Sequence, residues 1–160
     1  MSARKFMPHF VGAAALALVA ASASAQQRPE YTTSVTTEQA KKIAAAVIAE
    51  CTSNKWNVAV AVVDTAGNLV YFERMENTQT ASFDIAIMKA RAAATYRRPT
   101  RVFADVIAKS GPAIMTLPGV VASPGGLPLM VGGKVAGGVG VSGVTGDQDE
   151  QCSKAGLGAM

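Results

Sequence analysis

The sequence predicts an α+β domain in which about five antiparallel strands form a sheet flanked by helices. Runs of β-branched residues are joined by short turns rich in glycine and asparagine, as in β-hairpins. Stretches with helical spacing of apolar residues are grouped between and around these runs, which favours an antiparallel sheet. No internal repeat or interdomain linker divides the chain.

The first predicted elements are a helix and a hairpin. Thr36 and Gln39 have the spacing of a capping box, so the helix is expected to start there. Apolar residues then recur at helical spacing as far as about Asn54. Two strands joined by turn-forming residues follow. They are residues 56–63 (WNVAVAVV) and 69–74 (LVYFER), joined by 64–68 (DTAGN).

Two helices are predicted in the middle of the chain. Residues 80–97 carry apolar side chains along one side, with Ser82 as a candidate N-cap. Pro99 ends this helix, and Thr100 is placed to cap a shorter helix over residues 101–109. The sequence therefore predicts a break between two helices around Pro99.

Three short strands and a helix complete the predicted domain. Gly132-Gly133-Lys134 suits a tight hairpin between the last two strands. Asp147 and Glu150 have the spacing of a second capping box, which predicts a helix from there to the chain end. The strands are expected at residues 120–122, 127–131 and 135–142.

Residues 1–25 are predicted to be a secretion signal. Arg4 and Lys5 precede an apolar run over residues 10–21, and a small-x-small cleavage site ends at Ala25. The run is shorter than the roughly 20 residues of a spanning helix, so we expect no stable membrane insertion after cleavage. An uncleaved N-terminal anchor is the alternative. The mature protein is expected in the periplasm or outside the cell.

Cleavage of the signal would change the chemistry of the chain. Without Arg4 and Lys5, thirteen basic residues face eleven acidic ones, so the net charge falls from +4 to +2. No Lys/Arg block indicates a nucleic-acid partner. His9, the only histidine, is also lost, which excludes Ser-His-Asp and Cys-His catalysis, His-ligated zinc and a proximal-His haem. The remainder is expected to comprise a loose segment over residues 26–35 and one domain over 36–160.

The two cysteines, Cys51 and Cys152, are far apart in sequence and form no CxxC motif. In an oxidising compartment they are candidates for a structural disulfide that closes a long loop. Two separately buried thiols are the alternative.

Glycine is concentrated near the C-terminus, where twelve of the fifteen glycines lie between Gly119 and Gly158. Since glycine lacks a Cβ, such a segment leaves room for something bulky to approach, which we interpret as a binding function. Residues 138–143 match G-x-G-x-x-G, but the strand-turn-helix context of a dinucleotide site is missing. We take that match to be accidental.

The densest basic region surrounds the predicted helix break. Its arginines offer bidentate forks for carboxylates, although solvated helix faces are the alternative interpretation. Four methionines are candidate metal or haem-iron ligands, with core packing as the alternative. The basic residues are Lys89, Arg91, Arg97, Arg98 and Arg101, and the methionines are Met75, Met88, Met115 and Met130.

Three segments carry a family resemblance that covers about residues 35–160. They are WNVAVAVVDTAGNLVYFERMENTQTASFDIAIMKARAAATYRRPT, LPGVVASPGGLPLMVGGKVAGGVGVSG and DQDEQCSKAG. The chain resembles the GlcG/HbpS-like (DUF336, haem-degrading) family, which recurs as the C-terminal module of PduO-type cobalamin adenosyltransferases. The adenosyltransferase activity belongs to a separate domain of those proteins, so the resemblance does not imply it for this chain.

The resemblance implies a profilin-like fold and assembly into dimers or larger rings. It also implies haem and iron binding, as in some secreted members, or a role beside glycolate or diol catabolism, as in others. Thr100 is the residue that matches the family's candidate iron ligand, with Thr95 close by. Where other members use a histidine, this chain has none after the predicted signal.

Our first hypothesis is an exported, homo-oligomeric binding protein for a small molecule, with haem or a related tetrapyrrole as the ligand. The pocket is expected between the helix break and two glycine- and proline-containing loops, with arginines meeting the propionates. Its expected residues are Tyr96, Arg97, Arg98, Thr100, Pro118, Gly119, Gly125, Gly126, Leu127 and Pro128.

Two other hypotheses remain open. The second is an accessory protein or enzyme that acts on a small organic acid. In that case Arg97 or Arg101 would clamp a carboxylate, and Asp84 or Lys89 would act as acid or base. The third is a purely structural oligomer.

Overall fold

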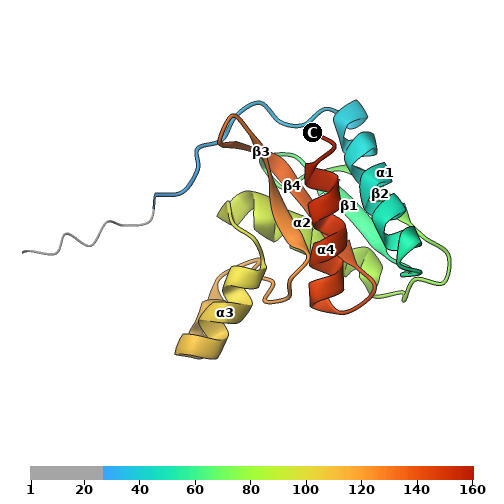
Figure 1. Cartoon of the computed structure of the whole chain (residues 1–160). Coiled ribbons are helices and arrows are strands. Elements are labelled where there is room, and N and C mark those ends of the chain that lie inside the picture. The colour runs from blue at the N-terminus through green and yellow to red at the C-terminus, as the bar shows by residue number, and fades with distance from the viewer. Residues whose placement is uncertain (1–26) are drawn as a thin grey trace, which may run out of the picture.

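The computed structural model describes residues 27–160, in which four strands form one antiparallel sheet (Figure 1). The spatial order of the strands is β2-β1-β4-β3, so the two hairpins lie side by side, joined by the β1–β4 pair. The strands are β1 (Ala59–Val63), β2 (Leu69–Arg74), β3 (Gly126–Val131) and β4 (Lys134–Ser142). The predicted signal over residues 1–25 lies outside the described residues.

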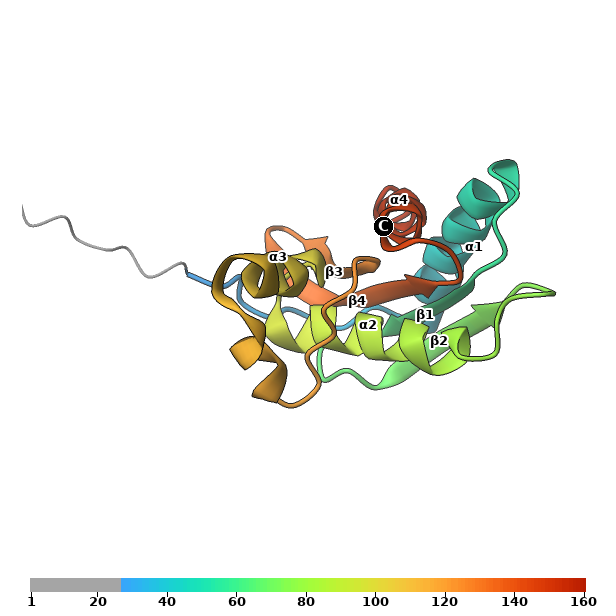
Figure 2. The ribbon, with the colours of Figure 1, turned by 90° about the horizontal axis from the view of Figure 1, so that it is seen from below.

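Helices cover both faces of the sheet. In Figure 2, α1 and α4 lie on one face, α2 crosses the other, and α3 lies beyond the end of α2. Among the described residues no helix is long and apolar enough to span a membrane. The helices are α1 (Thr37–Ser53), α2 (Ser82–Tyr96), α3 (Arg101–Ser110) and α4 (Gly146–Leu157), with a short 3-10 helix η1 (Pro112–Thr116).

The α+β fold class is confirmed, with four strands in place of about five. Residues 120–122, expected as a strand, are not one. Val120 packs instead with Ala92 and Phe103 in a small apolar cluster between α2 and α3. A short β-branched run was therefore mistaken for a strand, because its burial comes from helix contacts.

The first capping box is confirmed and the second is displaced by two residues. Thr36 and Gln39 cap α1 as expected. The box at the start of α4 is made by Thr145 and Gln148, not by Asp147 and Glu150. Ser82 does not cap α2; its buried hydroxyl lies 3.1 Å from that of Ser142 on β4.

The glycines of β4 are in contact with α2. Because side chains alternate along a strand, Gly138 and Gly140 face α2, whereas Val139 and Val141 face the core beneath α1 and α4. A Cβ at Gly140 would overlap the carbonyl oxygen of Ala86. The space left by these missing Cβ atoms is therefore filled by a helix, contrary to the expectation of a bulky ligand.

A disulfide joins Cys51 of α1 to Cys152 of α4, with 5.7 Å between the two Cα atoms. Both cysteines are fully buried in the main core. Because 101 positions separate them, the bond closes a loop that contains most of the domain. It stabilises the fold chiefly by restricting the unfolded chain.

The segment expected to be loose is held against the domain over residues 30–35. The backbone N–H of Thr32 donates to the carbonyl of Val135, and that of Val35 to Ala136. The Tyr31 hydroxyl donates to the carbonyls of Ala94 and Thr95 at the end of α2. We call residues 27–35 the N-terminal strap. Its backbone N–H and C=O groups pair with Val135 and Ala136 at the start of β4, and local sequence patterns do not reveal this long-range pairing.

Candidate functional site

A pocket of about 400 Å³ lies where the N-terminal strap crosses the break between α2 and α3. The strap, the helix break and β3 each contribute part of its lining. The lining residues are Gln27, Arg28, Pro29, Arg97, Arg98, Pro99, Val102, Pro128 and Met130. Three of the expected site residues, Arg97, Arg98 and Pro128, are brought together here.

The helix break is built by an unusual backbone conformation. Arg97 is the C-cap of α2 and has a left-handed backbone, with φ of 55°. Its guanidinium donates to the carbonyl of Pro29 (3.0 Å) and lies 5.2 Å from the centre of the Tyr31 ring. The side chain of Arg97 therefore connects the helix break to the strap.

Arg98 contributes an unsatisfied donor to the site. Its guanidinium lies over the Phe103 ring, 5.4 Å from the ring centre. The Nε atom is buried and has no hydrogen-bond partner. Buried donors without partners are rare in native proteins, so this Nε is an unusual feature of the helix break.

The charge of the pocket is positive and its walls are largely apolar. Arg28, Arg97 and Arg98 form no ion pairs with other residues in the part of the chain that the structure describes. No acidic side chain lines the pocket; the apolar surface comes from Pro99, Val102, Pro128 and Met130. Such an arrangement suits an apolar ligand that carries carboxylates.

Thr100 does not line this pocket. It is fully buried, and its hydroxyl donates to the carbonyl of Ser123 (2.6 Å) and accepts from the N–H of Gly126 (3.0 Å). It also makes no side-chain cap for α3. The hydroxyl is therefore engaged in joining the helix break to β3, which differs from the expected cap and from the expected iron ligand.

Replacing Thr100 with valine is expected to lower the free energy of unfolding by about 2 kcal/mol, because two buried backbone groups lose their partner. Urea denaturation measures this loss. Thr95→Val is the control, since that exposed hydroxyl bonds only within its own helix, and we expect a change below about 0.5 kcal/mol. Unchanged stability of Thr100→Val would contradict the structural role.

The other expected residues lie outside the pocket. The Tyr96 hydroxyl donates to the carbonyl of Pro118 (2.6 Å), which ties α2 to the loop before β3, and Gly119 is exposed with open space around it. Leu127 is buried in the main core. Tyr96, Gly119 and Leu127 are thus part of the protein framework around the loop and do not line the pocket with the arginines.

Gly125 and Gly126 are packed tightly against other residues. A Cβ on Gly126 would overlap the carbonyl of Lys89, and one on Gly125 would come within 3.1 Å of the Lys89 Nζ. The two glycines thus permit β3 to begin directly over α2. The expected cavity beside them is filled by protein atoms.

Lys89 and Asp149 form a buried ion pair below this loop. Their Nζ and Oδ2 atoms are 2.7 Å apart, with only 2% and 3% of the side chains exposed. The ammonium also donates to the carbonyl of Val141. Burial raises the pKa of Asp149, and Lys89 opposes that rise.

The residues of the small-acid enzyme hypothesis are not brought together. Lys89 is enclosed and paired, and it does not line the arginine-lined pocket. Arg101 forms ion pairs with Asp147 and Glu150 of α4, which raises its pKa. Asp84 is exposed in the first turn of α2. No acid–base pair faces the arginine-lined pocket.

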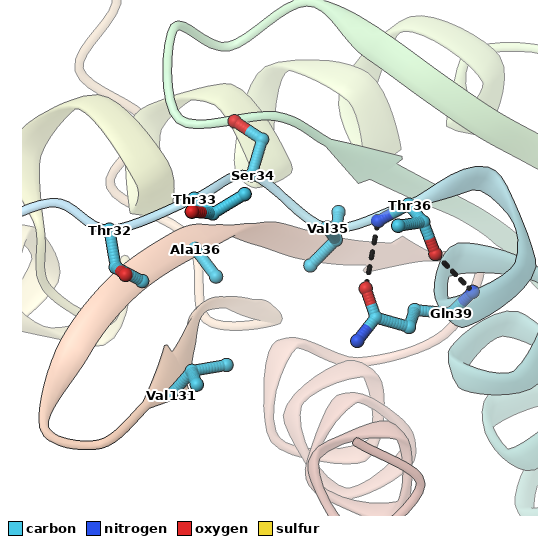
Figure 3. A pocket seen from close by; sticks show the side chains of 8 residues that line it. All are labelled: Thr32, Thr33, Ser34, Val35, Thr36, Gln39, Val131 and Ala136. Carbon is cyan, nitrogen blue, oxygen red and sulfur yellow. Dashed lines mark hydrogen bonds between the residues drawn. The ribbon is translucent and has the colours of Figure 1, made fainter.

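A second hollow, of about 330 Å³, lies further along the chain, where the strap leads into α1 (Figure 3). It is lined by strap residues 32–35, by the α1 N-cap Thr36, and by Gln39, Val131 and Ala136. The Thr36 and Gln39 groups that face it are already used in capping α1. Its lining is uncharged, so it offers no complement to an ionic ligand.

The sequence prediction missed the contribution of the strap. Gln27, Arg28 and Pro29 were placed in a loose segment, and no local pattern indicates that they reach the helix break. Met130, expected only as a candidate metal or haem-iron ligand, lies two residues after Pro128 on β3 and lines the pocket with it. Within residues 27–160 no cluster of three or more metal-ligating side chains occurs.

Comparisons with known proteins give a consistent result. The family model described as "Haem degrading protein HbpS-like" matches residues 35–158. Protein GlcG of Escherichia coli K12 is 36% identical over 106 residues, which cover 64% of this chain and 79% of GlcG.

Two solved structures share the fold. Streptomyces reticuli HbpS, as a double mutant, has a TM-score of 0.75 and 32% identity, with 92% of this chain and 99% of that chain covered. PduOC in complex with haem has a TM-score of 0.74 and 23% identity, with 80% and 96% covered.

Proposed function

Because the chain belongs to the HbpS-like family, we propose that it binds haem or a related tetrapyrrole in the pocket at the helix break. The observation that carries this proposal is the combination of apolar walls with three arginines that have no carboxylate partner among the lining residues. The known haem complex of PduOC, which has the same fold, supports the choice of ligand.

The residues of the pocket fit haem in two respects. Haem is a flat, apolar macrocycle with two propionates, and the arginines that line the pocket supply donors for carboxylates. Pro99, Val102, Pro128 and Met130 supply apolar surface for the rings. Bound haem would provide redox chemistry at its iron, while this chain contributes recognition of the carboxylates and the macrocycle.

The donor set around the pocket provides weak support for iron ligation. The Thr100 hydroxyl is used by two backbone groups, and no histidine occurs in residues 27–160. Met130 is the single lining residue with a sulfur donor. We therefore propose that binding depends on the carboxylates and the rings more than on the iron.

Titration of residues 26–160 with haem and with iron-free protoporphyrin tests this function. We expect saturable binding of both, with dissociation constants that differ by less than about tenfold, or 1.4 kcal/mol. Absorbance and tyrosine or tryptophan fluorescence report the binding. Failure of both to bind saturably would end the proposal. Binding of haem alone would show that an iron ligand dominates.

We also propose that the protein is exported and acts as a homo-oligomer. The signal-like N-terminus supports export, and so does the buried Cys51–Cys152 disulfide, because such bonds persist in oxidising compartments. Family membership supports assembly of several copies.

A small organic acid is the second candidate ligand. The same arginines would bind any accessible carboxylate, whereas the apolar walls favour a larger ligand. Competition of protoporphyrin by a panel of hydroxy and oxo acids distinguishes the two. Displacement at low concentration, or turnover of an acid, would favour the second candidate.

A further inference from the structure

Three arginines line the pocket, but their contacts differ. Arg97 has a partner: its Nη1 atom donates to the carbonyl of Pro29, and its guanidinium lies against the Tyr31 ring. For Arg28 and Arg98 the structure shows no ion pair and no side-chain hydrogen bond within residues 27–160, although the Arg98 guanidinium lies over the Phe103 ring. Two guanidiniums are therefore available to a ligand, and the third is committed to the protein.

The committed arginine acts on one of the available ones through the chain. Pro29 directly follows Arg28 in the chain. The hydrogen bond from Arg97 to the Pro29 carbonyl therefore fixes the backbone next to Arg28. Beyond that point the strap is held by Glu30, whose carbonyl accepts from Val135 and whose carboxylate pairs with Lys134. Arg97 is thus the contact nearest to Arg28; the Tyr31 hydroxyl, which bonds to the carbonyls of Ala94 and Thr95, also holds the strap at the end of α2.

We propose that Arg28 and Arg98 bind the two carboxylates of an apolar dicarboxylate, and that Arg97 is a positioning residue that holds Arg28 at the pocket. This inference rests on the proposed function and assigns the chemistry of that same site. Arg28, the partner of one carboxylate, belongs to the strap, and Arg98, the partner of the other, belongs to the helix break. The pocket is consequently complete only while the strap is in place.

The test compares iron-free protoporphyrin with its dimethyl ester, which lacks both charges. Loss of a charge-assisted hydrogen bond to a carboxylate should weaken protoporphyrin binding about tenfold or more in Arg28→Gln and in Arg98→Gln. Binding of the diester should be nearly unchanged by either substitution. Lys41→Gln, on the exposed face of α1, is the charge-matched control and should change neither.

A double-mutant cycle tests the positioning role of Arg97. Arg97→Gln alone should weaken protoporphyrin binding about as much as Arg28→Gln, but should add little in the Arg28→Gln background, because both act through one contact. Arg97→Lys retains a donor for the Pro29 carbonyl and should restore part of the affinity. Thermal melting of each variant shows that the fold is retained.

The outcomes separate this inference from the proposed function. If the unmodified protein binds protoporphyrin and Arg28→Gln binds it equally well, the inference fails and the function stands. Additive effects of Arg28→Gln and Arg97→Gln would overturn the positioning role. If the unmodified protein binds neither haem nor protoporphyrin, both the function and the inference are wrong.

Discussion

Replacing Gly140 with alanine is expected to prevent the domain from folding normally. The new Cβ would overlap two backbone atoms of α2, the Ala86 carbonyl oxygen and the Ala90 nitrogen. Backbone atoms within a helix cannot move aside singly, so α2 would have to separate from β4. We expect a loss of more than about 4 kcal/mol, beyond the range of ordinary substitutions, measured by circular dichroism during urea denaturation.

Gly158→Ala is the matched control for this experiment. Gly158 has a right-handed backbone, with φ of −71°, and its Cβ would make only an ordinary contact at 3.5 Å. We expect its stability to change by less than about 0.5 kcal/mol. A Gly140→Ala protein with the stability of the unmodified chain would show that the glycines of β4 do not serve helix packing.

Replacing Lys89 with methionine should produce the second-largest effect. The substitution leaves the Asp149 carboxylate buried without its cation, although Val144 still donates to its Oδ1 atom. Breaking a buried pair in this way costs about 3–5 kcal/mol. Urea denaturation near neutral pH measures the loss, and Lys89→Met/Asp149→Asn should recover much of it because the buried charge is gone.

The loss should depend on pH in a defined direction. Burial raises the pKa of Asp149 and Lys89 lowers it, so the substitution should raise that pKa further. A carboxyl whose pKa is raised by folding favours the folded state below its unfolded pKa, and this contribution disappears as pH rises through the folded pKa. The destabilisation should therefore be smaller at about pH 4 than at about pH 7. Equal losses at both would contradict an unpaired carboxylate as the cause.

Sequence patterns identified the helices and the paired strands because their signals are local. The capping box at Thr36, the turn at residues 64–68 and the Gly132-Gly133 connection depend on neighbouring residues alone. The failed strand at residues 120–122 shows the limit: β-branched residues indicate burial, and burial there comes from Phe103 and Ala92. The same limit applies to the glycines of β4. Their missing Cβ atoms indicate that another group packs closely against the strand, but not that this group is the helix α2.

The site was predicted only in part, for a related reason. The helix break and its arginines follow from Tyr96 to Thr100, where proline and a basic run coincide. The contribution of Arg28 follows from a contact across 68 positions between Arg97 and Pro29, and no spacing in the sequence predicts it. Thr100 matches the family's candidate ligand, yet here its hydroxyl satisfies two backbone groups.

Backbone amide chemical shifts measured during titration with iron-free protoporphyrin test the central claim most directly, because that ligand is diamagnetic and the shifts locate it. The account predicts that the largest changes cluster in the strap near Arg28, at residues 97–102 and around Met130. Changes centred on the uncharged hollow at residues 32–39, or spread over the domain without a cluster at the arginines, would contradict it.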